Sequence, residues 1–237
     1  MSNALHQIPY RSALIVGVGE GISAAVARRL AEAGVEVALA ARNVDKLEPL
    51  ARATGALALP ADASDPDSVA SLFDRVAQRM GDPEVVIYNA AGRLRGPLAE
   101  LDPAAVQQSL AVTAFGAFLV VRQAAARMLP RGHGAILLTG ATAGIKGFAQ
   151  SAPFAMGKFA LRGLAQSAAR ELGPRGIHVV HFVIDGSVRS ASRPEAPDKP
   201  DSTLDPEAIA QSYLDALRQP RSAWSTEIEL RPWVERF

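Results

Sequence analysis

The stretch Ser12-Ala-Leu-Ile-Val-Gly-Val-Gly-Glu-Gly-Ile-Ser23 joins a short apolar run to a cluster of glycines. The apolar run predicts a buried parallel strand over residues 12–18, and residues 22–33 have helical spacing that ends before Gly34. Glycine lets the backbone turn tightly and approach a pyrophosphate, while the helix start offers free amides and partial positive charge. The stretch therefore predicts a nucleotide-binding turn, and a glycine turn with a purely geometric role is the alternative. The residues predicted to contact the nucleotide here are Gly17, Gly19, Gly21 and Ile22.

Strand-like and helix-like segments alternate through most of the chain. Further apolar runs predict strands over residues 35–41, 56–61, 84–89, 135–139 and 177–184. Helical patterns cover residues 43–54, 103–129, 153–172 and 205–217. Three helices are predicted to begin at Asp-Pro pairs, with Asp65, Asp102 and Asp205 as the caps. This alternation predicts an α/β fold, a Rossmann-type doubly wound parallel sheet with helices on both faces.

The pattern shows no internal boundary, so we predict a single dinucleotide-binding domain over residues 1–237. Residues 190–204 are rich in Pro, Ser and charge and are predicted to form a mobile loop that shapes the substrate site. Residues 225–232 alternate like a final strand. Trp224, Trp233 and Phe237 are expected to pack the tail on the body, with a subunit contact as the alternative.

The composition excludes several functional classes. The formal net charge of +1 and the scattered Lys and Arg residues argue against a nucleic-acid or membrane-surface partner. The chain has no cysteine, which excludes disulfides, thiolate catalysis and Cys-based metal sites. The start over residues 1–11 is polar and lacks the apolar core of a signal peptide, and no uncharged apolar run is expected to be long enough to cross a bilayer. We therefore expect a cytoplasmic protein without a metal centre.

Several motifs together resemble the short-chain dehydrogenase/reductase family. Val16, Gly17, Gly21 and Ser23 fall on the fixed positions of its glycine loop, and Ser23 replaces the last glycine. The replacement is expected to loosen the packing of helix on strand. Asp62 matches the acid that meets the adenine in this family, with a turn or cap as its alternative role. The run Asn89-Ala90-Ala91-Gly92 matches the motif that ends the fourth strand, although Asn89 could instead only brace the sheet.

The resemblance implies a nicotinamide cofactor, and the end of the second strand indicates whether it is NADP or NAD. Ala40-Ala41-Arg42-Asn43 offers an arginine and no acid at the strand end, which favours the 2′-phosphate of NADP over NAD. Arg42 could also be an ordinary solvated residue. Glu20 opposes the assignment, because its carboxylate stands where NADP-preferring relatives often carry a base. We expect NADP, with NAD possible.

The resemblance also locates the catalytic positions, and three of the four have changed. Active relatives use Ser, Tyr and Lys with a water-positioning Asn. Here Lys158 is retained, Phe154 stands at the tyrosine position, Ala141 at the serine position and Thr113 at the asparagine position. A phenyl ring can neither donate nor accept a proton. Lys158 could still bond the nicotinamide ribose as a fixed cation, with an exposed helix lysine as the alternative.

Other polar residues near the sixth strand are weaker candidates. Ser190 could bond the nicotinamide carboxamide, as the resemblance implies. Asp185 could act as a base, although Asp-Gly is also a common turn pair. His178 and His181 are three apart on a predicted strand, so alternation directs them to opposite faces and argues against a shared metal site.

Three functions remain open from the sequence. The first is an NADP-dependent oxidoreductase with a nonstandard site, acting on an unknown small molecule such as an apolar carbonyl or a conjugated enoyl compound. The second is a catalytically silent nucleotide-binding sensor or partner subunit, and the third is a scaffold without a ligand. The resemblance also implies a homodimer or homotetramer through the helices near 103–129 and 153–172, whose apolar residues could equally be internal.

Overall fold

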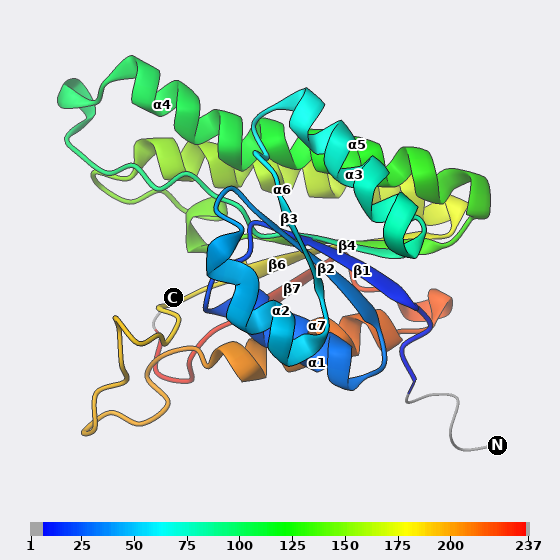
Figure 1. Cartoon of the computed structure of the whole chain (residues 1–237). Helices are drawn as coiled ribbons and strands as arrows, with labels where there is room; N and C mark the ends of the chain where they lie inside the picture. Colours follow the sequence, from blue (N-terminus) through cyan, green and yellow to red (C-terminus); the bar gives the residue numbers. More distant parts are fainter. Residues whose placement is uncertain (1–6, 236–237) are drawn as a thin grey trace.

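The computed structural model describes residues 7–235 of the chain. Within that range the strands form one parallel sheet of seven, in the order β3-β2-β1-β4-β5-β6-β7 (Figure 1). Every pair of neighbouring strands is parallel. The strands are β1 (Ser12–Val16), β2 (Glu36–Ala41), β3 (Leu57–Pro60), β4 (Val85–Tyr88), β5 (Gly134–Thr139), β6 (Ile177–Ile184) and β7 (Glu227–Leu230).

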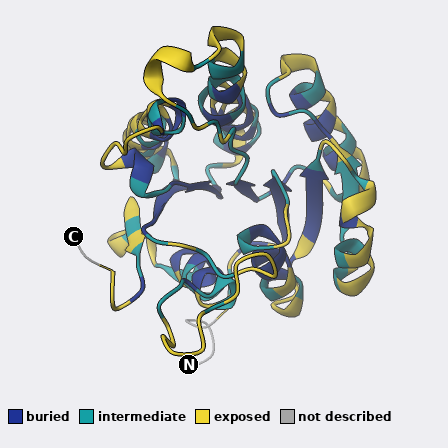
Figure 2. Ribbon diagram, turned by 90° about the vertical axis from the view of Figure 1, so that its left-hand side faces the viewer, coloured by how far each residue is buried: buried dark blue, intermediate teal, exposed yellow. Residues whose placement is uncertain are grey.

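Helices cover both faces of the sheet, as predicted (Figure 1). One face carries α3 (Pro66–Met80), α4 (Pro103–Leu110), α5 (Gly116–Met128) and α6 (Ala152–Leu172). The other face carries α1 (Ile22–Glu32), α2 (Glu48–Thr54) and α7 (Pro206–Arg218). The central strands are buried between these layers (Figure 2). Because they are covered on both sides, their sequences are continuous apolar runs rather than alternating ones.

The predicted ends of several elements are confirmed. β6 covers Ile177–Ile184, the range that the apolar run indicated. The three Asp-Pro pairs begin helices, and each aspartate side chain accepts a hydrogen bond from a backbone amide of the first turn. The expected final strand is present as β7, which pairs with β6.

The predicted helix over residues 103–129 is interrupted. A π-helical turn, η4 (Ala111–Phe115), separates α4 from α5. The stretch Pro103–Arg131 is also long and apolar enough to cross a membrane by length and composition alone, so the contrary expectation from the sequence was wrong. Within this stretch, α5 packs Ala117, Val120 and Ala124 into the core of the sheet, as a core helix does.

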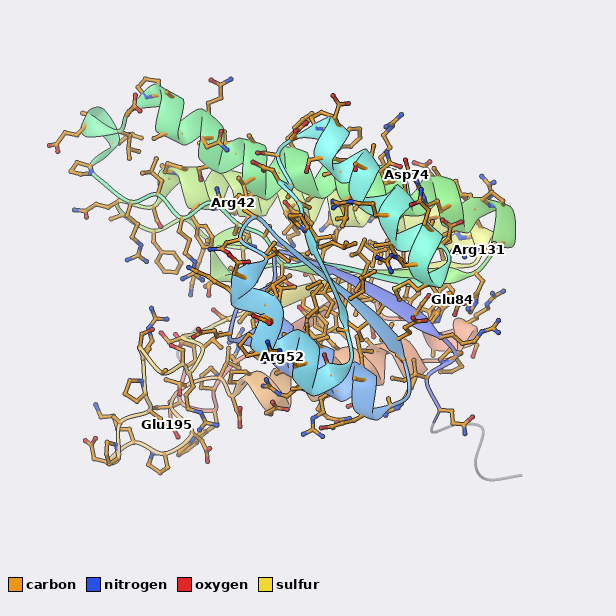
Figure 3. All side chains as sticks on the ribbon, viewed as in Figure 1. Arg42, Arg52, Asp74, Glu84, Arg131 and Glu195 are labelled. Carbon is orange, nitrogen blue, oxygen red and sulfur yellow. The ribbon has the colours of Figure 1, made fainter. Side chains whose placement is uncertain are left out.

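The strand order reverses beside β1, and this reversal sets the place of a binding crevice. β1 pairs with β2 on one side and with β4 on the other, so the loops that follow β1 and β4 leave toward opposite faces. In open parallel sheets, ligands bind at this point, outside the carboxyl ends of the strands. Figure 3 shows Arg42 at this end of the sheet and Glu84 at the opposite end.

The C-terminal segment packs on the body, in part as predicted. Trp224 stacks on His178, with ring centroids 4.6 Å apart. Trp233 is instead 80% exposed, so it contributes little to this packing. Phe237 lies outside the described residues.

Candidate active site

A cavity of about 1320 Å³ opens at the carboxyl end of the sheet. Its wall is built from the loops that follow the central strands and from the start of α6. It therefore gathers residues that are far apart in the sequence, as the fold requires. The residues predicted as site residues that line it are Gly17, Gly19, Gly21, Ile22, Arg42, Asp62, Asn89, Ala90, Ala141, Phe154, Lys158 and Ser190.

The glycine loop has the geometry of an anion cradle. Gly17 has a φ of +85°, and a Cβ added there would lie 2.3 Å from the backbone nitrogen of Ala90. A Cβ at Gly19 or Gly21 would meet nothing within 4 Å, so the loop presents bare backbone to the cavity. The first turn of α1 has no acidic residue and no capping side chain. Its amides are thus available to the phosphates of a dinucleotide.

Ser23 tightens this region, contrary to the expectation that it would loosen it. Its side chain is buried, and its hydroxyl donates to the Gly17 carbonyl oxygen at 3.3 Å. The Asn89 side-chain amide donates to the same Ser23 hydroxyl at 2.6 Å. Asn89 therefore braces the end of β4 against the glycine loop, which was the alternative role considered for it.

Cationic side chains surround the end of the cavity beyond β2 and β3. Arg42 follows β2, and Lys46, one helical turn later, also lines the wall. Glu20 is exposed and is not among the lining residues, so its carboxylate is removed from this end. Asp62 accepts hydrogen bonds from the hydroxyl and the amide of Ser64, and these bonds lower its pKa. Asp62 thus serves the turn after β3 while also facing the cavity.

Lys158 is buried at the centre of the cavity wall. Its Nζ donates to the carbonyl oxygen of Thr139 at 2.6 Å, and its side chain is only 3% exposed. Burial, together with the nearby charge of Arg93, lowers the pKa of Lys158 to about 7. It was expected to be a fixed cation, but it titrates near neutral pH because its ammonium has lost most of its hydration.

The residues at the altered positions separate into two groups. Phe154 and Ala141 both face the cavity, and neither has a polar side-chain atom. Thr113 lies in the π-helical turn, is fully buried, and is not among the lining residues. Its hydroxyl accepts a hydrogen bond from the amide of Gly92, which also does not line the cavity. These two residues hold the loop after β4 and do not line the cavity.

No tyrosine lies among the described residues that line the cavity. The chain has three, and each phenol is bonded elsewhere: Tyr10 to the Gly134 carbonyl, Tyr88 to the Val112 carbonyl and Tyr213 to Thr139. Burial raises the pKa of each phenol, to about 12 for Tyr10. None of the three phenols therefore faces the cavity beside Phe154.

Of the weaker candidates, Ser190 lines the cavity, whereas Asp185, His178 and His181 lie off its wall. Asp185 is buried and pairs with Arg231, with 3.2 Å between Oδ2 and Nη2. His178 stacks on Trp224, while His181 bonds Glu227 at 3.0 Å. In residues 7–235, no group of three His, Asp or Glu side chains is suited to hold a metal ion.

Several residues that the sequence did not single out contribute to the wall. Arg93 and Arg95 follow the Asn89–Gly92 motif directly, and Ser151 is the residue before α6. A sequence signal existed for each, because a residue directly after a ligand-binding strand end or directly before a helix at that end must lie near the crevice. Arg189 and Arg193 line the wall from the loop after β6.

Comparisons with known proteins agree with this geometry. A family model described as short chain dehydrogenase matches residues 11–200. The cis-4-hydroxycyclohexanecarboxylate dehydrogenase of Sinomonas cyclohexanicum is 35% identical over 174 residues, covering 71% of this chain and 70% of that protein. A short-chain dehydrogenase from Rhodopseudomonas palustris has a TM-score of 0.80 and 34% identity, covering 94% of this chain and 99% of the other. A metagenomic short-chain oxidoreductase in complex with NADP has a TM-score of 0.81 and 30% identity, and the match covers 94% of this chain and 98% of the other.

Proposed function

The chain belongs to the short-chain dehydrogenase family, and from that premise we propose that it is an NADP(H)-binding oxidoreductase with a nonstandard active site. The proposal rests on one observation. A single cavity joins a bare glycine cradle and a buried lysine to a wall that presents the apolar side chains of Phe154 and Ala141. In this proposal Phe154 stands where active relatives carry a tyrosine.

The residues at the nucleotide end fit a pyridine dinucleotide. The amides at the start of α1 would meet the pyrophosphate, and Asp62 would meet the adenine. Lys158 would bond the nicotinamide ribose, and Ser190 its carboxamide. When bound, the nicotinamide supplies hydride transfer to or from carbon, and the protein's part is to orient the substrate and exclude water.

The preference for NADP rests on the charges around the 2′-hydroxyl of the adenosine ribose. Arg42 can form two parallel hydrogen bonds to a phosphate, and Lys46 adds a second positive charge on the same side. No carboxylate at the end of β2 competes for the ribose hydroxyl, since that strand ends in Ala41.

The reaction end favours chemistry that does not need a phenol. Without a tyrosine, reduction of a ketone loses a proton donor that typically contributes about 10²- to 10⁴-fold. Reduction of a conjugated double bond depends on that donor less, because hydride goes to carbon and water can protonate afterwards. An apolar carbonyl or a conjugated enoyl compound is the proposed substrate class.

A silent nucleotide-binding protein is the second candidate, favoured by the same loss of hydroxyls. A titration with NADPH and NADH, followed by NADPH oxidation with ketones, quinones and enoyl thioesters, separates the two. Consumption of NADPH with any of these compounds supports the oxidoreductase. Tight binding without consumption supports the silent protein, and no binding of either nucleotide contradicts both.

We also propose a homodimer or homotetramer. Phe115, Phe118, Met156 and Phe159 are each about half exposed, and they belong to the π-helical turn, α5 and α6. Apolar surface of this kind is often covered in an oligomer. Light scattering coupled to size exclusion should give a mass of two or four chains, and a monomer at micromolar concentration contradicts the proposal.

A further inference from the structure

The charges on the cavity wall are strongly unbalanced, although the whole chain has a formal net charge of only +1. The wall contains a single carboxylate, Asp62, among the described residues that line it. Arg189 is neutralised by Glu195 and Asp205, at 3.4 and 2.6 Å. The cationic lining residues are Arg42, Lys46, Arg93, Arg95, Lys158, Arg189 and Arg193.

Arg93 lies at the reaction end of the cavity, away from the adenine end. Its guanidinium carbon is 5.5 Å from the ring centroid of Phe154, and the Nζ of Lys158 is 5.8 Å from the same centroid. The ring is attractive to both cations but cannot neutralise them. Burial and the nearby charge of Arg93 both lower the pKa of Lys158.

The start of α6 points to the same place. Ser151 lines the cavity and is only 3% exposed, yet its hydroxyl makes no hydrogen bond to any described residue and does not cap the helix. Pro153 has no N–H, so the amides of Ala152 and Phe154 are the first-turn donors without an acceptor inside the helix, and a helix start favours negative charge. The Gly96 amide donates to the Gln150 carbonyl at 3.1 Å, which fixes the Arg93–Arg95 loop beside this helix start.

We propose that Arg93, the Ser151 hydroxyl and the start of α6 form a binding site for a carboxylate of the substrate. The site rests on the proposed function, because it names the substrate class for the same cavity. A guanidinium and a hydroxyl can together donate three hydrogen bonds to a carboxylate. The apolar Phe154 and Ala141 would contact the uncharged part of the molecule. The substrate is thus a small organic acid whose carboxylate is remote from the bond that is reduced or oxidised.

Benzoate and benzamide are a matched pair of probes, since they share shape and differ in charge. Calorimetric titration of the wild-type protein, with and without saturating NADP⁺, should show benzoate binding roughly 10-fold or more tightly than benzamide. Arg93→Gln should weaken benzoate about 10-fold or more and leave benzamide and NADPH unchanged. Ser151→Ala should weaken benzoate by a smaller factor, and Arg93→Lys should retain part of the affinity.

Arg79→Gln, which removes an exposed arginine of α3 outside the cavity, is the control for loss of charge alone. Equal affinity for the two probes, or an equal effect of Arg93→Gln and Arg79→Gln, overturns the carboxylate site. Weaker NADPH binding by Arg93→Gln, to the same extent as benzoate, also overturns it, because Arg93 would then serve the nucleotide. If NADPH does not bind the wild-type protein, the proposed function is contradicted instead. The comparison of benzoate with benzamide then still tests the carboxylate site.

Discussion

The two ends of the cavity differ in the chemical groups that line them. At the nucleotide end, the Gly17–Ile22 loop, Arg42 and Asp62 present amides and charged groups suited to phosphate, ribose and adenine. At the reaction end, Phe154 and Ala141 present carbon only, and within residues 7–235 no ion pair joins Arg93 or Lys158 to a carboxylate. Under the proposed function, the chain keeps the groups that bind a dinucleotide and has changed those that move protons.

The largest effect is expected at Gly17, which tests the nucleotide end. Gly17→Val requires an unfavourable φ and places side-chain carbon against the Ala90 backbone. NADPH binding should weaken by more than about 100-fold. Gly163→Ala is the control, because that glycine lies on α6 with open space around it. Fluorescence titration checks both, and unchanged NADPH affinity in Gly17→Val would refute the role of the loop.

The next effect concerns Lys158, which lies where the two ends meet. Its pKa is about 7 in the folded protein and 10.5 when unperturbed, so between these values the unfolded chain binds more protons and stability rises with pH. The burial penalty is fully present below pH 7. Lys158→Met should therefore increase the free energy of unfolding, and the gain should be about 2–3 kcal/mol larger at pH 6 than at pH 9.

Urea unfolding at the two pH values measures this gain, with Lys199→Met as the exposed control. A gain that does not depend on pH would mean that Lys158 keeps its proton throughout the range. The reaction end would then contain a compensating anion, and the contrast between the two ends would be weaker than described.

A smaller effect is expected from Arg42→Glu. NADPH should bind roughly 10- to 100-fold more weakly, because a charge-assisted pair with the 2′-phosphate is replaced by repulsion. NADH should change by no more than about 3-fold, since it lacks that phosphate. Parallel titrations with both nucleotides measure the difference. An equal loss for both would remove the assignment of NADP.

The smallest effect is expected from Phe154→Tyr. The new phenol would meet no serine hydroxyl at Ala141, and Thr113 is turned away from the cavity, so carbonyl reduction should not be restored. NADPH affinity should remain within about 3-fold of wild type. A panel of neutral ketones with NADPH measures the activity, and rapid turnover by this single variant would show that the rest of the reaction end is intact.

The sequence predicted the fold and the nucleotide end better than the reaction end. β6 was predicted to the residue because it is buried on both faces and mostly apolar, and the Asp-Pro caps were predicted because their chemistry is local. Gly92 and Thr113 matched motif positions, but a motif does not say where a side chain points, and these two bond each other. The positions of Arg93 and Ser151 after a strand end and before a helix placed them near the crevice, but the sequence could not show that their two loops meet. The π-helical turn η4, which interrupts the predicted helix over residues 103–129, could not be predicted from a periodic apolar pattern.

The contrast between the two ends is tested most directly by following the fluorescence of protein-bound NADPH before and after a neutral ketone is added. We predict a saturable signal from bound NADPH that persists, with ketone-dependent loss at least about 100-fold slower than the typical turnover of about 10 per second. Absence of a bound signal at millimolar NADPH, or its loss at that ordinary rate, would contradict the prediction.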